Sequence, residues 1–120
     1  MAGFLTTHVL DIARGHPADG MSIELWRIEA PHGGRTLLKS VLTNAEGRTD
    51  GPLLDGSDFG EGLYELVFAV GRYFAALEMN DAVPPFLDDV PVRFGIADAK
   101  AHYHVPLLVS PWAYSTYRGS

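Results

Sequence analysis

The chain has 120 residues, 47% of them hydrophobic, and its 15 acidic against nine basic side chains give a net charge of −6. This acidic balance, with Arg and Lys scattered singly, argues against a nucleic-acid-binding protein, which would carry a basic stripe. The lack of cysteine excludes disulfides, thiolate catalysis and cysteine-ligated zinc. The length fits one domain, residues 1–120, large enough to bury a core without such staples.

Neither a secretory signal nor a membrane span is visible. Residues 1–8 lack the basic segment and long apolar run of a signal peptide. No stretch approaches the roughly 18 apolar residues that a transmembrane helix needs. We therefore expect a cytoplasmic protein without a membrane partner.

Apolar residues alternate with other residues along most of the chain, which is the period-two pattern of β-strands. The pattern predicts strands over residues 5–11, 22–29, 36–43, 63–70, 90–96, 102–109 and 114–117. One short helix is predicted over residues 72–79, where Tyr73, Phe74 and Leu77 recur at helical spacing. Turn residues separate the strands at residues 15–20, 31–34, 44–47 and 50–52. Seven or eight short strands divided by turns indicate an all-β sandwich.

Five histidines are candidates for chemistry. His16 and His32 lie in predicted turns, beside Pro17 and Gly33, and are expected to be solvated loop residues. His8 lies inside the first predicted strand, where a histidine is either a hydrogen-bonded structural residue or a catalyst.

His102 and His104 are two residues apart on a predicted strand, so they share one face at roughly 6–7 Å. The pair allows three interpretations. It could be two ligands of a zinc site, with His8 or a carboxylate as the third. It could supply a general base and a neighbour that orients it. It could also be a polar sheet face without chemistry.

Two other features could bind a ligand. Arg48 follows the turn glycine Gly47 and is either a solvated rim residue or a planar donor fork for carbonyl or ring-nitrogen acceptors. The last four residues, Tyr117 to Ser120, follow a strand without a polar tail. Chain ends usually fray. Because this end has no polar tail, it indicates an ordered terminus in a site or an interface, and a frayed end is the alternative.

Nucleophilic catalysis has little support in the sequence. No Gly-x-Ser-x-Gly elbow is present, and Ser110-Pro111 lacks the strained turn of that motif. Two histidines with arginine and tyrosine suit a small, polar, planar and possibly anionic ligand.

Three separated segments carry a family resemblance. Residues 5–11, followed by Glu24-Leu25-Trp26, form the opening segment, and residues 44–48 form a turn ending in Gly-Arg. Residues 102–120 form the third, from His102-Tyr103-His104-Val105-Pro106 to the closing Tyr117-Arg118-Gly119-Ser120. Together they resemble the 5-hydroxyisourate hydrolases, the transthyretin-related enzymes of purine degradation. The closing tetrapeptide distinguishes these hydrolases from the hormone carrier transthyretin.

The resemblance implies an all-β, transthyretin-like (prealbumin-like) sandwich of eight strands with one short helix. It implies a homotetramer with active sites between dimers, a small purine-derived substrate, no cofactor and no metal. The implied reaction opens the six-membered ring of 5-hydroxyisourate to give 2-oxo-4-hydroxy-4-carboxy-5-ureidoimidazoline. The implied catalytic residues are His8, Arg48, His104 and Ser120. The implied substrate-binding residues are His8, Arg48, Tyr117 and Arg118.

In the mechanism that this implies, His8 and His104 position and deprotonate a water molecule while Arg48 stabilises the attacked carbonyl oxygen. Two rival functions remain at this point. One is a carrier that binds a small aromatic ligand without turnover. The other is a structural sandwich that binds a protein partner.

Overall fold

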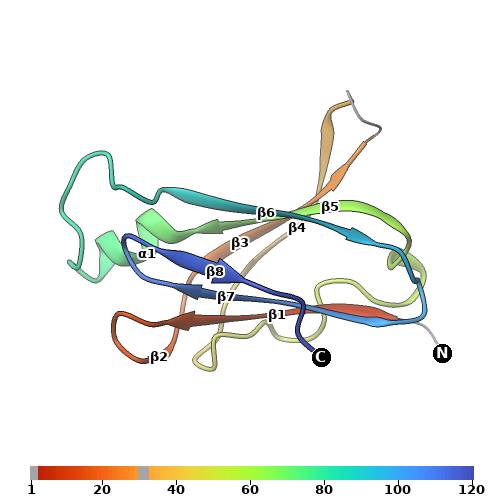
Figure 1. Ribbon diagram of the computed structural model, residues 1–120, viewed down its shortest axis with the longest axis horizontal. Helices are drawn as coiled ribbons and strands as arrows, with labels where there is room; N and C mark the ends of the chain where they lie inside the picture. The colour runs from red at the N-terminus through yellow and green to blue at the C-terminus, as the bar shows by residue number, and fades with distance from the viewer. Residues whose placement is uncertain (1–2, 30–32) are drawn as a thin grey trace.

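Two four-stranded sheets pack face to face in the computed structural model, which describes residues 3–29 and 33–120 (Figure 1). The strand order is β2-β1-β7-β8 in the first sheet and β4-β3-β5-β6 in the second. The elements are β1 (Phe4–Asp11), β2 (His16–Pro17), β3 (Ser22–Ile28), β4 (Arg35–Leu42), the 3₁₀ turn η1 (Gly56–Asp58), β5 (Gly62–Ala69), α1 (Val70–Ala76), β6 (Asp89–Ile96), β7 (His102–Val109) and β8 (Tyr114–Thr116). The predicted all-β sandwich of eight strands with one short helix is confirmed.

Seven of these strands match the predicted ranges to within one residue at each end. The eighth, β2, lies in a segment that the sequence predicts as a turn. Pro17 pairs with Leu10 and His16 with Asp11, antiparallel to the end of β1. Two residues between turn glycines are too few to show an alternating pattern, so the sequence does not reveal this strand.

The helix begins earlier and ends earlier than predicted. Val70, which continues the apolar alternation of β5, is the first residue of α1 and not the last residue of the strand. The helix stops at Ala76 because the chain reverses at Glu78, whose φ of 57° is a left-handed conformation that ends a helix. Glutamate is not a residue that normally indicates such a stop, so the sequence predicted a helix that is too long.

Strand alternation fills the space between the sheets with apolar side chains. From the first sheet, Leu5, Val9 and Leu107 are fully buried, and Ile23 and Phe68 meet them from the second. Because alternate residues of a strand point to opposite faces, the residues between the buried ones face outward. The outer face of the first sheet is therefore where half-buried polar side chains of β1 and β7 gather.

No helix of residues 3–29 and 33–120 is long and apolar enough to cross a membrane. The predicted turn at residues 31–34 includes His32, which lies outside the described residues.

Candidate active site

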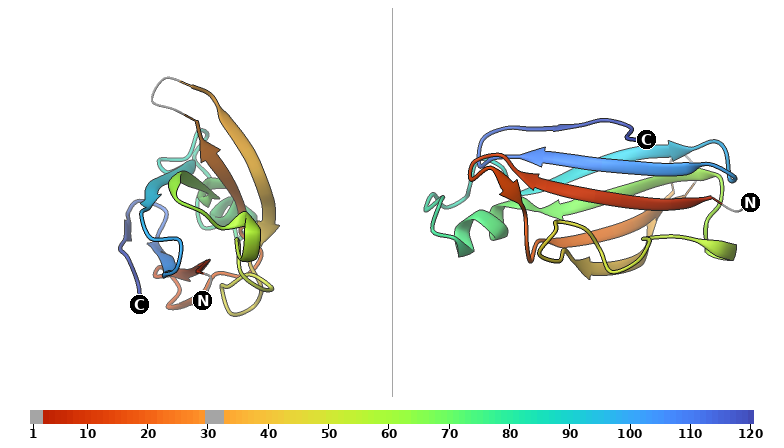
Figure 2. Two further views of the ribbon diagram at one scale, coloured as in Figure 1. Left: turned by 90° about the vertical axis from the view of Figure 1, so that its right-hand side faces the viewer. Right: turned by 90° about the horizontal axis from the view of Figure 1, so that it is seen from below.

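The parallel pairing of β1 with β7 brings four polar residues together. In register, Thr6 lies opposite His104 and His8 opposite Pro106, while Phe4 lies opposite His102. Figure 2 shows β1 and β7 side by side over their whole length. The next residue along each strand is buried in the core, so these side chains share the outer face. We call Thr6, His8, His102 and His104 the histidine cluster.

The Thr6 hydroxyl is the centre of this cluster. Its oxygen lies 2.7 Å from Nε2 of His102 and 2.8 Å from Nδ1 of His104. The His102 ring is also stacked on Phe4, with ring centroids 4.1 Å apart and planes 12° from parallel. Both histidines are half-buried, so their rings are oriented by contacts and still reachable from solvent.

Arg48 reaches this face because its loop runs along the free edge of β1. Val9 donates its backbone N–H to the carbonyl oxygen of Gly47 at 2.8 Å. Gly47 has a φ of +74°, and a Cβ there would collide with the Val9 carbonyl oxygen. Glycine is therefore required for the close approach that sets Arg48 beside the strand of His8. Thr6 and Arg48 both line a shallow pocket of about 240 Å³.

The side chain of Asn44 holds this loop in shape. Its Oδ1 accepts hydrogen bonds from the backbone N–H groups of Glu46 and Arg48, at 2.9 and 3.1 Å. Its Nδ2 donates to Asp50 Oδ1 at 3.1 Å. An asparagine that bonds its own turn in this way replaces backbone partners and rigidifies the loop. Asn44 thus determines where the Arg48 backbone lies.

Burial and the positive charge of Arg48 both favour the neutral forms of His8 and His104. Burial lowers the pKa of His104 below its ordinary value of 6.5, and the charge of Arg48 and then His102 and His8 lower it further. Burial and Arg48 also lower the pKa of His8, against the opposing effect of the Glu46 backbone and carboxylate. Both imidazoles are therefore unprotonated near neutral pH and able to accept a proton.

The end of the chain lies against His104. Gly119 donates its backbone N–H to the His104 carbonyl oxygen at 2.8 Å and forms an isolated bridge with that residue. A Cβ at position 119 would lie 2.5 Å from Cδ2 of the His104 ring, so only glycine allows this approach. The segment around Gly119 therefore packs against His104, and Ser120 follows directly as an exposed residue.

Tyr117 and Arg118 line a pocket other than that of Thr6 and Arg48, although Arg118 Nη2 also donates to the backbone carbonyl oxygen of His102 at 3.5 Å. The Arg118 guanidinium lies 4.1 Å from the centre of the Tyr103 ring, which belongs to the opposite face of β7 from His104. Tyr117 and Arg118 line a second pocket of about 370 Å³ together with Phe94 of β6 and its neighbours. Of the six expected site residues, the structure brings His8, Arg48 and His104 together, with Ser120 beyond Gly119 at their edge.

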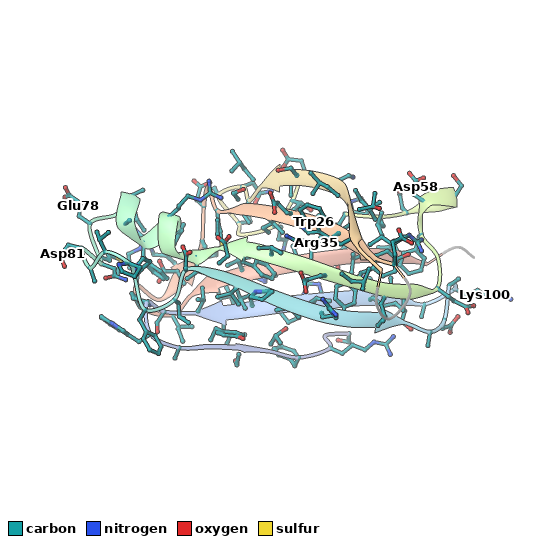
Figure 3. The ribbon with its side chains drawn as sticks, turned by 90° about the horizontal axis from the view of Figure 1, so that it is seen from above. Trp26, Arg35, Asp58, Glu78, Asp81 and Lys100 are labelled. Carbon is teal, nitrogen blue, oxygen red and sulfur yellow. The ribbon has the colours of Figure 1, made fainter. Side chains whose placement is uncertain are left out.

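The remaining polar features have other roles. His16 is exposed on β2, with Nδ1 2.9 Å from the Pro17 carbonyl oxygen, and takes no part in the cluster. Among residues 3–29 and 33–120, no group of three His, Asp or Glu side chains could hold a metal ion. On the outer face of the second sheet, Arg35 and Trp26 are neighbours (Figure 3). The Arg35 guanidinium lies 3.9 Å from the centre of the Trp26 ring and pairs with Glu65 at 3.2 Å. Those charges stabilise a sheet face.

Sequence reasoning missed three contributors to the site. The role of Thr6 depends on the parallel pairing of β1 with β7. Its partners His102 and His104 are almost the whole chain away in sequence, so no local pattern indicates the contact. Gly119 and Asn44 stand inside the segments that carry the family resemblance, but only the geometry assigns them a function. A turn asparagine followed by Gly-Arg was the one local signal available for Asn44.

Comparison with known proteins agrees with this geometry. A family model described as "Transthyretin: HIUase/Transthyretin family" matches residues 5–119. A protein named 5-hydroxyisourate hydrolase 2, from Rhizobium meliloti, is 56% identical over 99% of this chain and 98% of its own length.

Solved structures of both kinds of family member resemble the chain. The 5-hydroxyisourate hydrolase of Klebsiella pneumoniae is 32% identical with a TM-score of 0.80, over 98% of this chain and 99% of that one. Sea bream transthyretin in complex with thyroxine is 26% identical with a TM-score of 0.85, over 96% and 93%. Because both structures resemble the chain closely, the fold alone does not decide between the two functions.

Proposed function

The chain belongs to the HIUase/transthyretin family, and we infer that it is a 5-hydroxyisourate hydrolase of urate degradation. The reaction opens the six-membered ring of 5-hydroxyisourate to give 2-oxo-4-hydroxy-4-carboxy-5-ureidoimidazoline. The observation that carries this inference is the placement of His8 and His104 on one sheet face, each near enough to Arg48 for its charge to lower the pKa of the imidazole. A site for an apolar hormone has no use for two bases next to a guanidinium.

The proposed chemistry follows from the groups that the site contains. Water is a weak nucleophile at neutral pH and needs a base, which a neutral histidine provides. His104 and His8 position the water and remove its proton as its oxygen attacks a ring carbonyl carbon. Arg48 donates hydrogen bonds to the oxygen on which negative charge develops. The ring C–N bond then breaks, and the proton moves to the leaving nitrogen.

The chain end contributes in two ways in this proposal. Gly119 holds the tail against His104, which would bring the Ser120 hydroxyl to the edge of the catalytic groups. Tyr117 and Arg118 bind substrate, and since they lie toward β6 in their own chain, they serve a site completed by a neighbouring subunit. A homotetramer with sites between dimers provides that neighbour.

Light scattering coupled to size exclusion tests the tetramer, which would appear as four times the 13.1 kDa of one chain. A monomer with full activity would contradict the shared site. The proposed location is the cytoplasm, and cell fractionation with an antibody against the native protein tests it.

The activity itself is tested on the transient intermediate of urate oxidation. Enzymatic oxidation of urate produces an ultraviolet-absorbing species, and a catalytic amount of the protein should accelerate its decay. His16→Asn is a matched control, because His16 is an exposed histidine outside the cluster, and it should keep the full acceleration. If the decay rate does not change while thyroxine binds, the chain is a carrier and the proposed hydrolase function is wrong.

A further inference from the structure

The Thr6 hydroxyl makes two hydrogen bonds with only one hydrogen. Its partners are Nε2 of His102 at 2.7 Å and Nδ1 of His104 at 2.8 Å. A hydroxyl can donate one bond and accept others, so at least one of the two imidazoles must donate to it. The Thr6 bonds therefore restrict which nitrogen of each ring can carry a proton.

Deepening the proposed function, on which it rests, we propose that Thr6 and His102 hold His104 in the tautomer whose Nε2 is unprotonated and accepts the proton of the attacking water. In this arrangement His104 Nδ1–H donates to the Thr6 oxygen, and the Thr6 hydroxyl donates to Nε2 of His102. His102 then carries its proton on Nδ1. Thr6 and His102 are positioning residues, because both act through His104.

The reverse arrangement would disable the base. If Thr6 donated to Nδ1 of His104, then Nε2 of that ring would carry the proton and could only donate. Among the described residues, Nε2 of His104 has no hydrogen-bond partner, so it is the nitrogen left for the reaction. The proposed direction keeps that lone pair free.

The proposed direction also fits the charged state that the reaction creates. When Nε2 accepts a proton from water, an O–H bond breaks, a new N–H bond forms, and His104 becomes a cation that donates from both nitrogens. Its Nδ1–H bond to Thr6 already exists, so the network needs no rearrangement during the transfer. Donation from Thr6 to His102 makes the Thr6 oxygen a stronger acceptor for this cation.

His102 is held firmly enough to serve as the last acceptor. Its ring lies flat on Phe4, and its strand is fixed by the parallel pairing with β1. The side chain is half-buried, where a hydrogen bond is stronger than in water.

Nitrogen-15 NMR of histidine-labelled protein tests the tautomer without any assay of activity. Near pH 7.5, both His102 and His104 should show a protonated Nδ1 and an unprotonated Nε2. A His104 with its proton on Nε2 would overturn the proposal. If instead the tautomer is as proposed but 5-hydroxyisourate is not turned over, the hydrolase function fails and the network remains.

Variants then test whether the network matters for turnover. Thr6→Val removes the hydroxyl and should lower kcat roughly 10- to 100-fold, with little change in KM. This loss is a part of the roughly 10²- to 10⁴-fold rate enhancement that a general base typically contributes. Thr6→Ser keeps the hydroxyl and should restore most of the rate. His102→Phe keeps a ring against Phe4 but removes the acceptor, and it should lower kcat in the same way.

The double variant and a neighbouring threonine separate positioning from structure. If Thr6 and His102 act as one network, Thr6→Val combined with His102→Phe should cost no more than the worse single change. Thr7→Val is the matched control, because the Thr7 hydroxyl donates to the buried Val105 carbonyl on the other face. It should lower the unfolding midpoint and leave the His104 tautomer unchanged. Fully additive losses, or a tautomer shift in Thr7→Val, would contradict the proposal.

Discussion

Two polar clusters lie at opposite ends of β1, and they differ in how many of their polar atoms have hydrogen-bond partners. At one end of β1, the buried Asp11 accepts four hydrogen bonds, from the backbone N–H groups of Ala13 and Arg14, the Arg14 side chain and the Tyr73 hydroxyl. At the other end, the histidine cluster is half-buried and faces outward. Among the described residues, Nε2 of His104 is left without a partner.

The difference shows what separates a structural network from a reactive one. Burial alone would raise the pKa of Asp11, but the hydrogen bonds from Arg14 and Tyr73 lower it overall and keep the carboxylate charged. The Asp11 carboxylate is thus occupied by hydrogen bonds from other groups of the protein. In the histidine cluster, burial and Arg48 lower the pKa of His8 and His104 and so favour their neutral rings, whose lone pairs are available to a substrate or water. Substitutions in the two clusters should therefore fail in different assays.

The largest effect is expected from His104→Asn. Loss of the base should lower kcat/KM by about 10² to 10⁴, measured from the decay of enzymatically generated 5-hydroxyisourate. The free energy of unfolding should change by less than about 1 kcal/mol, because the side chain lies on an open face. Retained turnover would remove His104 from the mechanism, and the same result for His8→Asn would remove His8.

Asp11→Asn should reverse this pattern. The amide would present a donor toward Arg14 or Tyr73, and breaking such a buried pair costs about 3 kcal/mol of unfolding free energy. Urea denaturation measures this loss, and the rate per folded molecule should stay close to that of the wild type. Tyr73→Phe removes the two hydrogen bonds of the hydroxyl, one donated to Asp11 and one accepted from Arg14, and should cost about 2 kcal/mol. Equal stability of all three proteins would show that the pairing of Asp11 contributes nothing.

Deleting residues 117–120 tests the edge of the reactive cluster. The sandwich should still fold, since β8 ends at Thr116, but hydrolysis should fall roughly 10- to 100-fold as His104 loses the contact that orders it. Gly119→Ala should reproduce much of this loss, because its Cβ would meet the His104 ring. Gly34→Ser is the neutral control for adding a side chain to a glycine, because Gly34 is exposed and a Cβ there would contact no other atom. Loss of folding after the deletion would make the tail structural.

How much the sequence can predict differs between the two clusters. Period-two alternation locates seven strands, because each strand buries one face. It also places His102 and His104 on one face. It says nothing about which strands are neighbours, and the parallel pairing of β1 with β7 alone brings Thr6 and His8 to that face. The family resemblance implied His8, Arg48 and His104 as catalytic residues without that knowledge.

The Asp11 cluster had no signal in the sequence at all. Tyr73 is separated from Asp11 by four strands and counts in the sequence only as an apolar residue of a helix. Arg14 follows three residues after Asp11, a spacing without meaning in a strand or turn. Partners of this kind are decided by tertiary packing, which also moved the start of α1 to Val70.

The two clusters should also respond to pH in different windows. Because the pKa of His104 is lowered from the ordinary histidine value of 6.5, kcat/KM should rise with pH and have its inflection below that value. Arg48 is one cause of the lowering, so Arg48→Gln should move the inflection to higher pH, whereas Arg48→Lys keeps the charge and should leave it in place. An inflection that is the same in both variants would show that the charge of Arg48 does not act on the base.

Asp11 behaves as a group with a lowered folded pKa: its stabilisation is complete above the ordinary value of 3.8 and is lost as pH falls through the folded value. Unfolding free energy measured between pH 5 and pH 2 should therefore fall less steeply in Asp11→Asn than in the wild type, while the activity profile near pH 6 is the same in both.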